Sequence, residues 1–245
     1  IGSRNCDYMP KMWRWAQVYS KQFPTPGLAY MYRTAETAAD EVIAELKISA
    51  VETIYDTRNP FAAADKTLQL MESDNPPAYI RKAVLIRDNV LLVVPILKRT
   101  DLKNSKGRPI YTPIVAKGHQ ELEESDLLTA AFAAWALEPW QGEMPETAYV
   151  YLKPMVDKRG QTPKTNAHFK INVNDYLPRI RAIYEGFMDA AEEASNASEK
   201  EVQESRPARR CGERKTCPWA ANCREKLVEA DDLSMMPLPA SAKQS

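Results

Sequence analysis

Several residue types are scarce in this chain, and each scarcity excludes a class of protein. The chain has only two histidines and four cysteines among its 245 residues. Four cysteines are far too few for a small secreted domain that is held together by disulfides. The 33 basic side chains are balanced by 33 acidic ones, which excludes polybasic tails and acidic disordered segments. The longest apolar run, Val90 to Leu97, has strand length, far below the roughly 20 residues of a membrane span.

The start of the chain and its apolar content narrow the class further. The sequence begins Ile-Gly-Ser, without Met and without the charged and apolar regions of a signal peptide, so we expect a trimmed or fragmentary N-terminus. Because no apolar run is long enough to span a membrane, we expect a cytoplasmic protein with no membrane partner. Hydrophobic residues make up 44% and charged residues 27%, which are ordinary values for a globular protein. The chain is therefore long enough and apolar enough to bury a substantial core.

Helical and strand patterns alternate along the chain. Apolar residues recur every three or four positions in the helical segments, and β-rich runs lie between them. The expected helices are 8–23, 34–47, one opened by Asn59-Pro60, 123–140, and one capped by Asn174 or Asp175. The expected strands are 78–87, 90–98, 110–117, 147–153 and 169–173. This order predicts an α/β fold in which one mixed sheet is flanked by helices.

Composition divides the chain into three regions. Residues 1–58 read as a helical region, residues 59–195 as the α/β core, and residues 196–245 as a polar linker followed by a cysteine-rich segment. Asp88-Asn89 is expected to turn the first hairpin, and residues 100–109 are expected to form a polar loop.

Four segments in this order resemble one family of nucleases. They are TLQLMESDNPPAYIRKAVLIRDNVLLVVPIL (67–97), IYTPIVAK (110–117), LEPWQGEMPETAYVYL (137–152), and KTCPWAANC followed by DDLS (231–234). Together they resemble the RecB-like PD-(D/E)XK nucleases that carry a C-terminal cysteine cluster. The resemblance implies a restriction-endonuclease-like mixed sheet flanked by helices, with a C-terminal cysteine-rich segment.

The catalytic motifs of that family are altered in this chain. Active members hold Mg²⁺ or Mn²⁺ with an Asp on one strand and an Asp or Glu two residues before a Lys, because these ions prefer oxygen ligands. The resemblance places these acids at Ile96 and Val115, while Lys117 is retained. The Gln and Tyr of the following helix fall on Thr129 and Ala133. The pattern implies a degenerate nuclease site, in which Lys117 is a remnant or a solvated strand-end lysine.

Nearby polar residues offer an alternative site. Asp101 is expected to be a turn residue, and Glu121, Glu123 and Glu124 are expected near a helix N-terminus, where they favour the helix dipole. His119 lies close to Lys117 and is a candidate base or ligand, or simply an exposed loop histidine. The second histidine, His168, has no partner that the sequence predicts.

The cysteines form a separate candidate site. In iron–sulfur members of the family, one N-terminal and three C-terminal cysteines hold a 4Fe–4S cluster, which here implies Cys6, Cys211, Cys217 and Cys223. Arg214 stands where the family has a ligand, so Cys211 would have to replace it. Thiolates also bind Zn²⁺, and buried thiols without metal are the third possibility.

Three functions remain open at this stage. The leading one is a catalytically degenerate RecB-like nuclease module that binds DNA, or serves as a scaffold for a protein partner, in a repair, recombination or defence complex. An active Mg²⁺- or Mn²⁺-dependent DNase and a purely structural protein-interaction subunit are the alternatives. The candidate DNA contacts are Lys11 and Arg14, which lie among aromatic residues near the N-terminus, and Arg209 and Arg210, which lie in the basic stretch of the cysteine segment.

Overall fold

The computed structural model describes residues 26–48, 52–53, 59–88, 90–153, 167–198 and 220–230. The chain separates into two compact units, one made of residues 33–181 and the other of the chain before and after that range. The whole sheet lies in the first of these units. The predicted boundaries at residues 58 and 195 stay a prediction.

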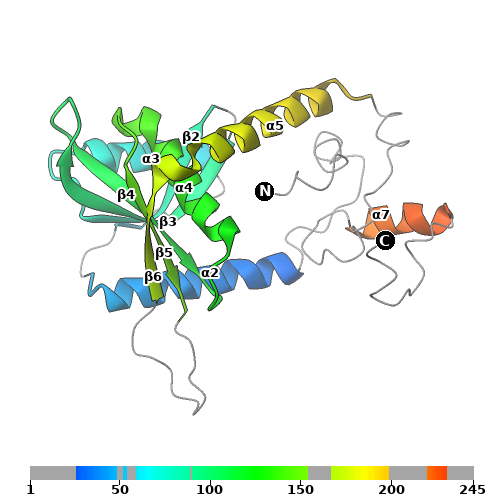
Figure 1. The fold of residues 1–245 in the computed structure, drawn as a ribbon, viewed down its shortest axis with the longest axis horizontal. Helices are drawn as coiled ribbons and strands as arrows, with labels where there is room; N and C mark the ends of the chain where they lie inside the picture. Colours follow the sequence, from blue (N-terminus) through cyan, green and yellow to red (C-terminus); the bar gives the residue numbers. More distant parts are fainter. Residues whose placement is uncertain are drawn as a thin grey trace, which may run out of the picture. The chain divides into compact units, whose positions relative to one another are not determined.

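A six-stranded mixed sheet forms the centre of the 33–181 unit (Figure 1). Its strands follow chain order across the sheet: β1 (Glu52–Thr53), β2 (Tyr79–Arg87), β3 (Val90–Lys103), β4 (Pro109–Lys117), β5 (Thr147–Leu152) and β6 (Ala167–Asn172). The pairs β1–β2 and β4–β5 are parallel, and the other neighbours are antiparallel. The prediction of one mixed sheet in an α/β fold is confirmed.

Helices cover both faces of the sheet (Figure 1). On one face, which we call the α2 face, the helix α2 (Pro26–Glu45) packs Ala38, Ala39 and Val42 against strand residues that include Ile96 and Ile114. The opposite face, the α4 face, is covered by α3 (Pro60–Glu72) and α4 (Glu124–Gln141). Their apolar residues there are Ala63, Ala64, Met71, Ala133, Ala136 and Leu137.

The sequence explains where the covering helices begin and end. The Asn59 side chain accepts a hydrogen bond from the Ala62 N–H at 3.1 Å, and proline follows it at the first helical position, so α3 begins at the predicted residue. The helix α4 ends at Gly142, whose φ of 79° lies in the left-handed region that glycine adopts without strain. The remaining described helices are η2 (Val173–Tyr176), α5 (Leu177–Asn196) and α7 (Ala220–Glu229).

Two expected boundaries differ from those of the structure. The helix predicted for 34–47 begins earlier, at Pro26, and β3 continues through Lys103 where a loop was expected. Asp101 therefore lies in a strand, within the irregular part of the β3–β4 register between Arg99 and Lys103, and the turn begins only at Asn104. The helix predicted for 8–23 lies outside the described residues. Within the described ranges, no helix has the length and apolar character that a membrane crossing requires.

Candidate nuclease-like site

The two strand positions expected to carry metal-binding acids lie on opposite faces of the sheet. Ile96 pairs directly with Ile114 across β3 and β4, and both side chains are buried on the α2 face. Side chains alternate along a strand, so Val115, one residue after Ile114, points to the α4 face. Acids at Ile96 and Val115 would be separated by the sheet itself and could not share one metal ion.

Lys117 lies on the α4 face and is held by a carboxylate that the sequence reading missed. Its Nζ lies 3.1 Å from Oδ1 of Asp126, whose side chain has no exposed surface, whereas the Lys117 side chain is 26% exposed. The His119 Nε2 lies 2.8 Å from the other oxygen of the same carboxylate. The three residues, which we call the Lys117 cluster, gather where β4 ends and α4 begins. Lys117 is the last residue of β4, as expected of a strand-end lysine, but its side chain is only partly exposed and is paired with Asp126.

Two local features of the chain position the cluster. Asp126 lies in the first turn of α4, where its Oδ2 accepts a hydrogen bond from the Glu123 N–H at 3.0 Å and so satisfies a donor at the helix start. A β-carbon built on Gly118 would lie 2.0 Å from Cγ2 of Thr34 in α2, so only glycine fits between Lys117 and His119. The His119 carbonyl accepts a bond from the Lys153 N–H at 3.0 Å, which ties this loop to the end of β5.

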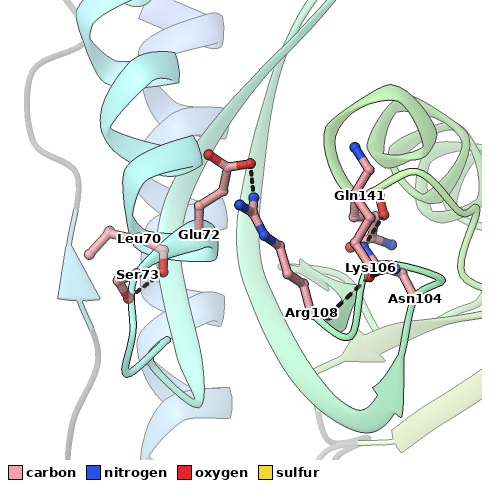
Figure 2. A network of polar contacts seen from close by, with 7 residues as sticks. All are labelled: Leu70, Glu72, Ser73, Asn104, Lys106, Arg108 and Gln141. Atoms are coloured by element: carbon pink, nitrogen blue, oxygen red, sulfur yellow. Dashed lines mark hydrogen bonds and ion pairs between the residues drawn. The ribbon is translucent and has the colours of Figure 1, made fainter.

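A second polar network lies at the other end of α4 (Figure 2). The Gln141 side chain accepts a hydrogen bond from the Tyr111 N–H at 2.9 Å and donates to the carbonyls of Tyr111 and Glu143. Asn104 donates to the Gln141 carbonyl at 2.6 Å, and its Oδ1 accepts from the backbone of the turn that follows. This glutamine, which belongs to the family-like segment 137–152, fastens α4 to the irregular stretch of β3 and β4. Its observed contacts are structural.

An open cleft of about 420 Å³ adjoins this network. Its walls include Leu68, Met71 and Trp140, and the ion pair between Arg108 and Glu72, drawn in Figure 2, borders it. The side-chain amides of Asn104 and Gln141, which line the cleft, form hydrogen bonds with backbone groups. The Trp140 indole N–H donates to the Ile86 carbonyl at 2.9 Å.

The donor set around Lys117 does not fit the divalent metal that the family resemblance implies. Ile96 and Val115 carry no ligating atom, and the lysine lies against the nearest carboxylate. Within the described residues no three His, Cys, Asp or Glu side chains come together as a metal site. Hard cations such as Mg²⁺ need several oxygen ligands, which a single carboxylate does not supply.

Most residues of the predicted cysteine and DNA sites lie outside the described residues. These are Cys6, Cys211, Cys217, Lys11, Arg14, Arg209 and Arg210. Cys223 is described: it lies in α7 with 2% of its surface exposed. A 4Fe–4S cluster or a zinc ion at these cysteines, and DNA contacts at these basic residues, stay predictions.

Asp126 had a signal in the sequence that could have been used. It is four residues before Ala130, seven before Ala133 and eleven before Leu137, all buried on one side of α4. A carboxylate in the apolar stripe of a helix must be paired, because an unpaired buried charge is strongly disfavoured. The nearest cation in the sequence is Lys117.

The comparisons with known proteins place the chain in no family. No protein-family model matches the sequence, and no curated protein matches it either.

Proposed function

We propose that the chain is a nuclease-like module that has lost its metal-binding acids and acts by binding DNA, or as a scaffold, within a repair, recombination or defence complex. The observation that carries the proposal is the Lys117 cluster. Its lysine stands where the resemblance expects a catalytic lysine, but it is neutralised by a fully buried Asp126. A lysine committed to an ion pair supports the fold without requiring a metal.

The chemistry of nuclease catalysis supports the same proposal. Metal-dependent nucleases stabilise charge on the attacked phosphate with a cation held by carboxylates. Ile96 and Val115, at 0% and 3% exposure, contribute apolar packing at the two positions where the resemblance would place the acids. The proposal therefore assigns these positions to stability and leaves recognition to other surfaces.

Paired assays test the proposal. The purified chain is incubated with fluorescent single- and double-stranded DNA in Mg²⁺ or Mn²⁺ to follow cleavage, and binding is followed by fluorescence anisotropy at several salt concentrations. We expect salt-dependent binding and no cleavage. Binding absent at low salt would leave the structural, protein-interaction role and overturn the DNA-binding one.

A second candidate, an active metal-dependent DNase, is favoured by one observation. A carboxylate and an imidazole, those of Asp126 and His119, lie together beside Lys117. If this cluster were catalytic, cleavage would be present and Lys117→Met would abolish it while the chain stayed folded. The Lys66→Met variant is the matched control, because Lys66 is an exposed lysine of α3 outside the cluster.

A further inference from the structure

We propose that the α2 face of β5 and β6 binds single-stranded nucleic acid, with Tyr149 as a platform for a base and Lys98 and Lys170 as phosphate contacts. This inference rests on the DNA-binding form of the proposed function and deepens it by naming the surface and the form of the nucleic acid. None of these residues belongs to the Lys117 cluster.

The register of the strands brings aromatic and basic side chains together. Tyr149 of β5 pairs directly with Lys170 of β6, and Tyr151 pairs with His168. Directly opposed residues share a face, and Tyr149 and Tyr151 both pack with the apolar cluster beneath α2. The rings of Tyr151 and His168 are stacked, with centroids 5.5 Å apart.

A third strand adds a second lysine to this surface. The Nζ of Lys98 in β3 lies 5.8 Å from the centroid of the Tyr149 ring, within the range of a cation–π contact. Lys170 is exposed, and Lys98 and Tyr149 are half-buried. An extended strand crossing the face would thus meet an aromatic ring with a cation on each side of it.

Three acids of the neighbouring helix α2 are already paired with cations, whereas the two lysines of the proposed surface are not paired with acids. On α2, Glu36 pairs with Lys82, Asp40 with Arg81, and Glu41 with Lys153. By contrast, Lys98 and Lys170 have no ion pair with an acid in the part of the chain that the structure describes.

Uncompensated cations beside a ring suit phosphates and bases together. In a duplex the faces of the bases are covered by their neighbours, so a platform of this kind selects unpaired bases. Stacking is tolerant of sequence, because every base has a π face. The expected ligand is therefore single-stranded DNA or RNA with little sequence preference.

The test uses the full chain and fluorescein-labelled 12-mers of dT and U, with a 12-base-pair DNA duplex as comparison. Fluorescence anisotropy is measured over a range of salt concentrations. We expect each single strand to bind more tightly than the duplex. The ratio of the affinities for dT and U shows whether single-stranded DNA or RNA is the preferred ligand. For each of Lys98→Gln and Lys170→Gln, the slope of log K against log salt should fall by about 0.7. Lys66→Gln should leave the slope unchanged.

The aromatic contribution has its own matched pair of variants. Tyr149→Phe keeps the ring and should keep the affinity, whereas Tyr149→Leu keeps apolar bulk and should weaken binding about tenfold, as expected for one lost stacking contact. Melting temperatures confirm that both variants are folded, and Lys170→Gln gives a second readout at an exposed position.

Two results would overturn the inference. If the chain binds DNA but none of the Lys98, Tyr149 and Lys170 variants changes affinity or salt dependence, the surface is wrong while the proposed function stands. If inorganic polyphosphate competes as strongly as dT and Tyr149→Leu binds normally, attraction is by charge alone and the stacking role fails.

Discussion

Lys117 Nζ lies 3.1 Å from Oδ1 of Asp126, a carboxylate with no exposed surface at the start of α4. Removing the lysine leaves a buried charge whose remaining partners are the His119 ring and the Glu123 N–H. Breaking a buried ion pair from one side is costly, and partial exposure of Lys117 lowers that cost. We expect Lys117→Met to lower the free energy of unfolding by about 1–3 kcal/mol, measured by urea denaturation.

The double variant separates the ion pair from other effects of the substitution. In Lys117→Met combined with Asp126→Asn, no buried charge remains and a side-chain oxygen is still present to accept from the Glu123 N–H, so much of the lost stability should return. Lys66→Met serves as the control for loss of a lysine. If Lys117→Met were as stable as the parent chain, the ion pair between Lys117 and Asp126 would not contribute to the stability of the fold.

The difference between predictable and unpredictable features is clear at α4. Its existence and its ends follow from local signals, namely the apolar repeat and the glycine at position 142. Leu128 and Phe132, two large apolar residues of α4, are only partly buried, whereas Asp126 is fully buried. Tertiary packing decides which side of an alanine-rich helix contacts the sheet. In α4, the side that packs on the sheet places Asp126 next to Lys117.

The sheet shows the same limit. The hairpin of β2 and β3 was expected from two β-rich runs around Asp88, and the structure has it. The face on which each side chain lies depends on register, which no local pattern determined. The pairing of Ile96 with Ile114 therefore overturned the idea of one site shared by positions 96 and 115.

Tyr111 should make stability depend on alkaline pH. Burial raises the pKa of its phenol to about 12, and its hydroxyl donates to the Pro77 carbonyl at 2.6 Å. In the unfolded chain the phenol ionises near its ordinary value of about 10. The folded state therefore binds the proton more tightly, so this stabilisation is complete below about pH 10 and declines as the pH rises toward 12.

The comparison of the parent chain with Tyr111→Phe isolates this effect. At neutral pH the variant should be about 1 kcal/mol less stable, because it lacks the hydrogen bond to Pro77. The advantage of the parent chain should shrink as the pH is raised from 10 to 12 and should reverse in sign before pH 12, measured by urea denaturation at each pH. An advantage of the parent chain that grew over this range would contradict the assignment.

Gln141 should be among the most sensitive polar residues of the fold. It is 5% exposed, and its side chain bonds both the N–H and the carbonyl of Tyr111. Gln141→Ala leaves these backbone groups buried without partners, which should cost about 2–4 kcal/mol. The exposed Gln69 of α3 provides the control, since Gln69→Ala should change stability by less than about 0.5 kcal/mol.

Restoring acids at the expected motif positions should not restore a nuclease. Ile96→Asp places an unpaired carboxylate in the core beneath α2, and Val115→Glu adds one on the other side of the sheet. The first change should cost more than about 3 kcal/mol. The double variant should show neither Mn²⁺-dependent cleavage nor a rise in melting temperature with Mn²⁺. A Mn²⁺-dependent rise would mean that the two positions do share an ion.

Gly118 and Thr34 provide the sharpest test of how β4 meets α2. A β-carbon at Gly118 would lie 2.0 Å from the Thr34 Cγ2 but 3.3 Å from its Cβ, so only the methyl group is in severe conflict. Gly118→Ala should therefore destabilise the chain by about 1–3 kcal/mol, because an added carbon in a packed core forces neighbouring atoms to move.

A double variant tests whether Thr34 is the cause. Thr34→Ala removes the methyl, and the double variant should recover most of the lost stability. Unfolding free energies of the four proteins give the coupling, which should exceed about 0.5 kcal/mol for two residues in contact. Additive effects would show that Gly118 is required for another reason, such as the backbone path that carries His119 to Asp126.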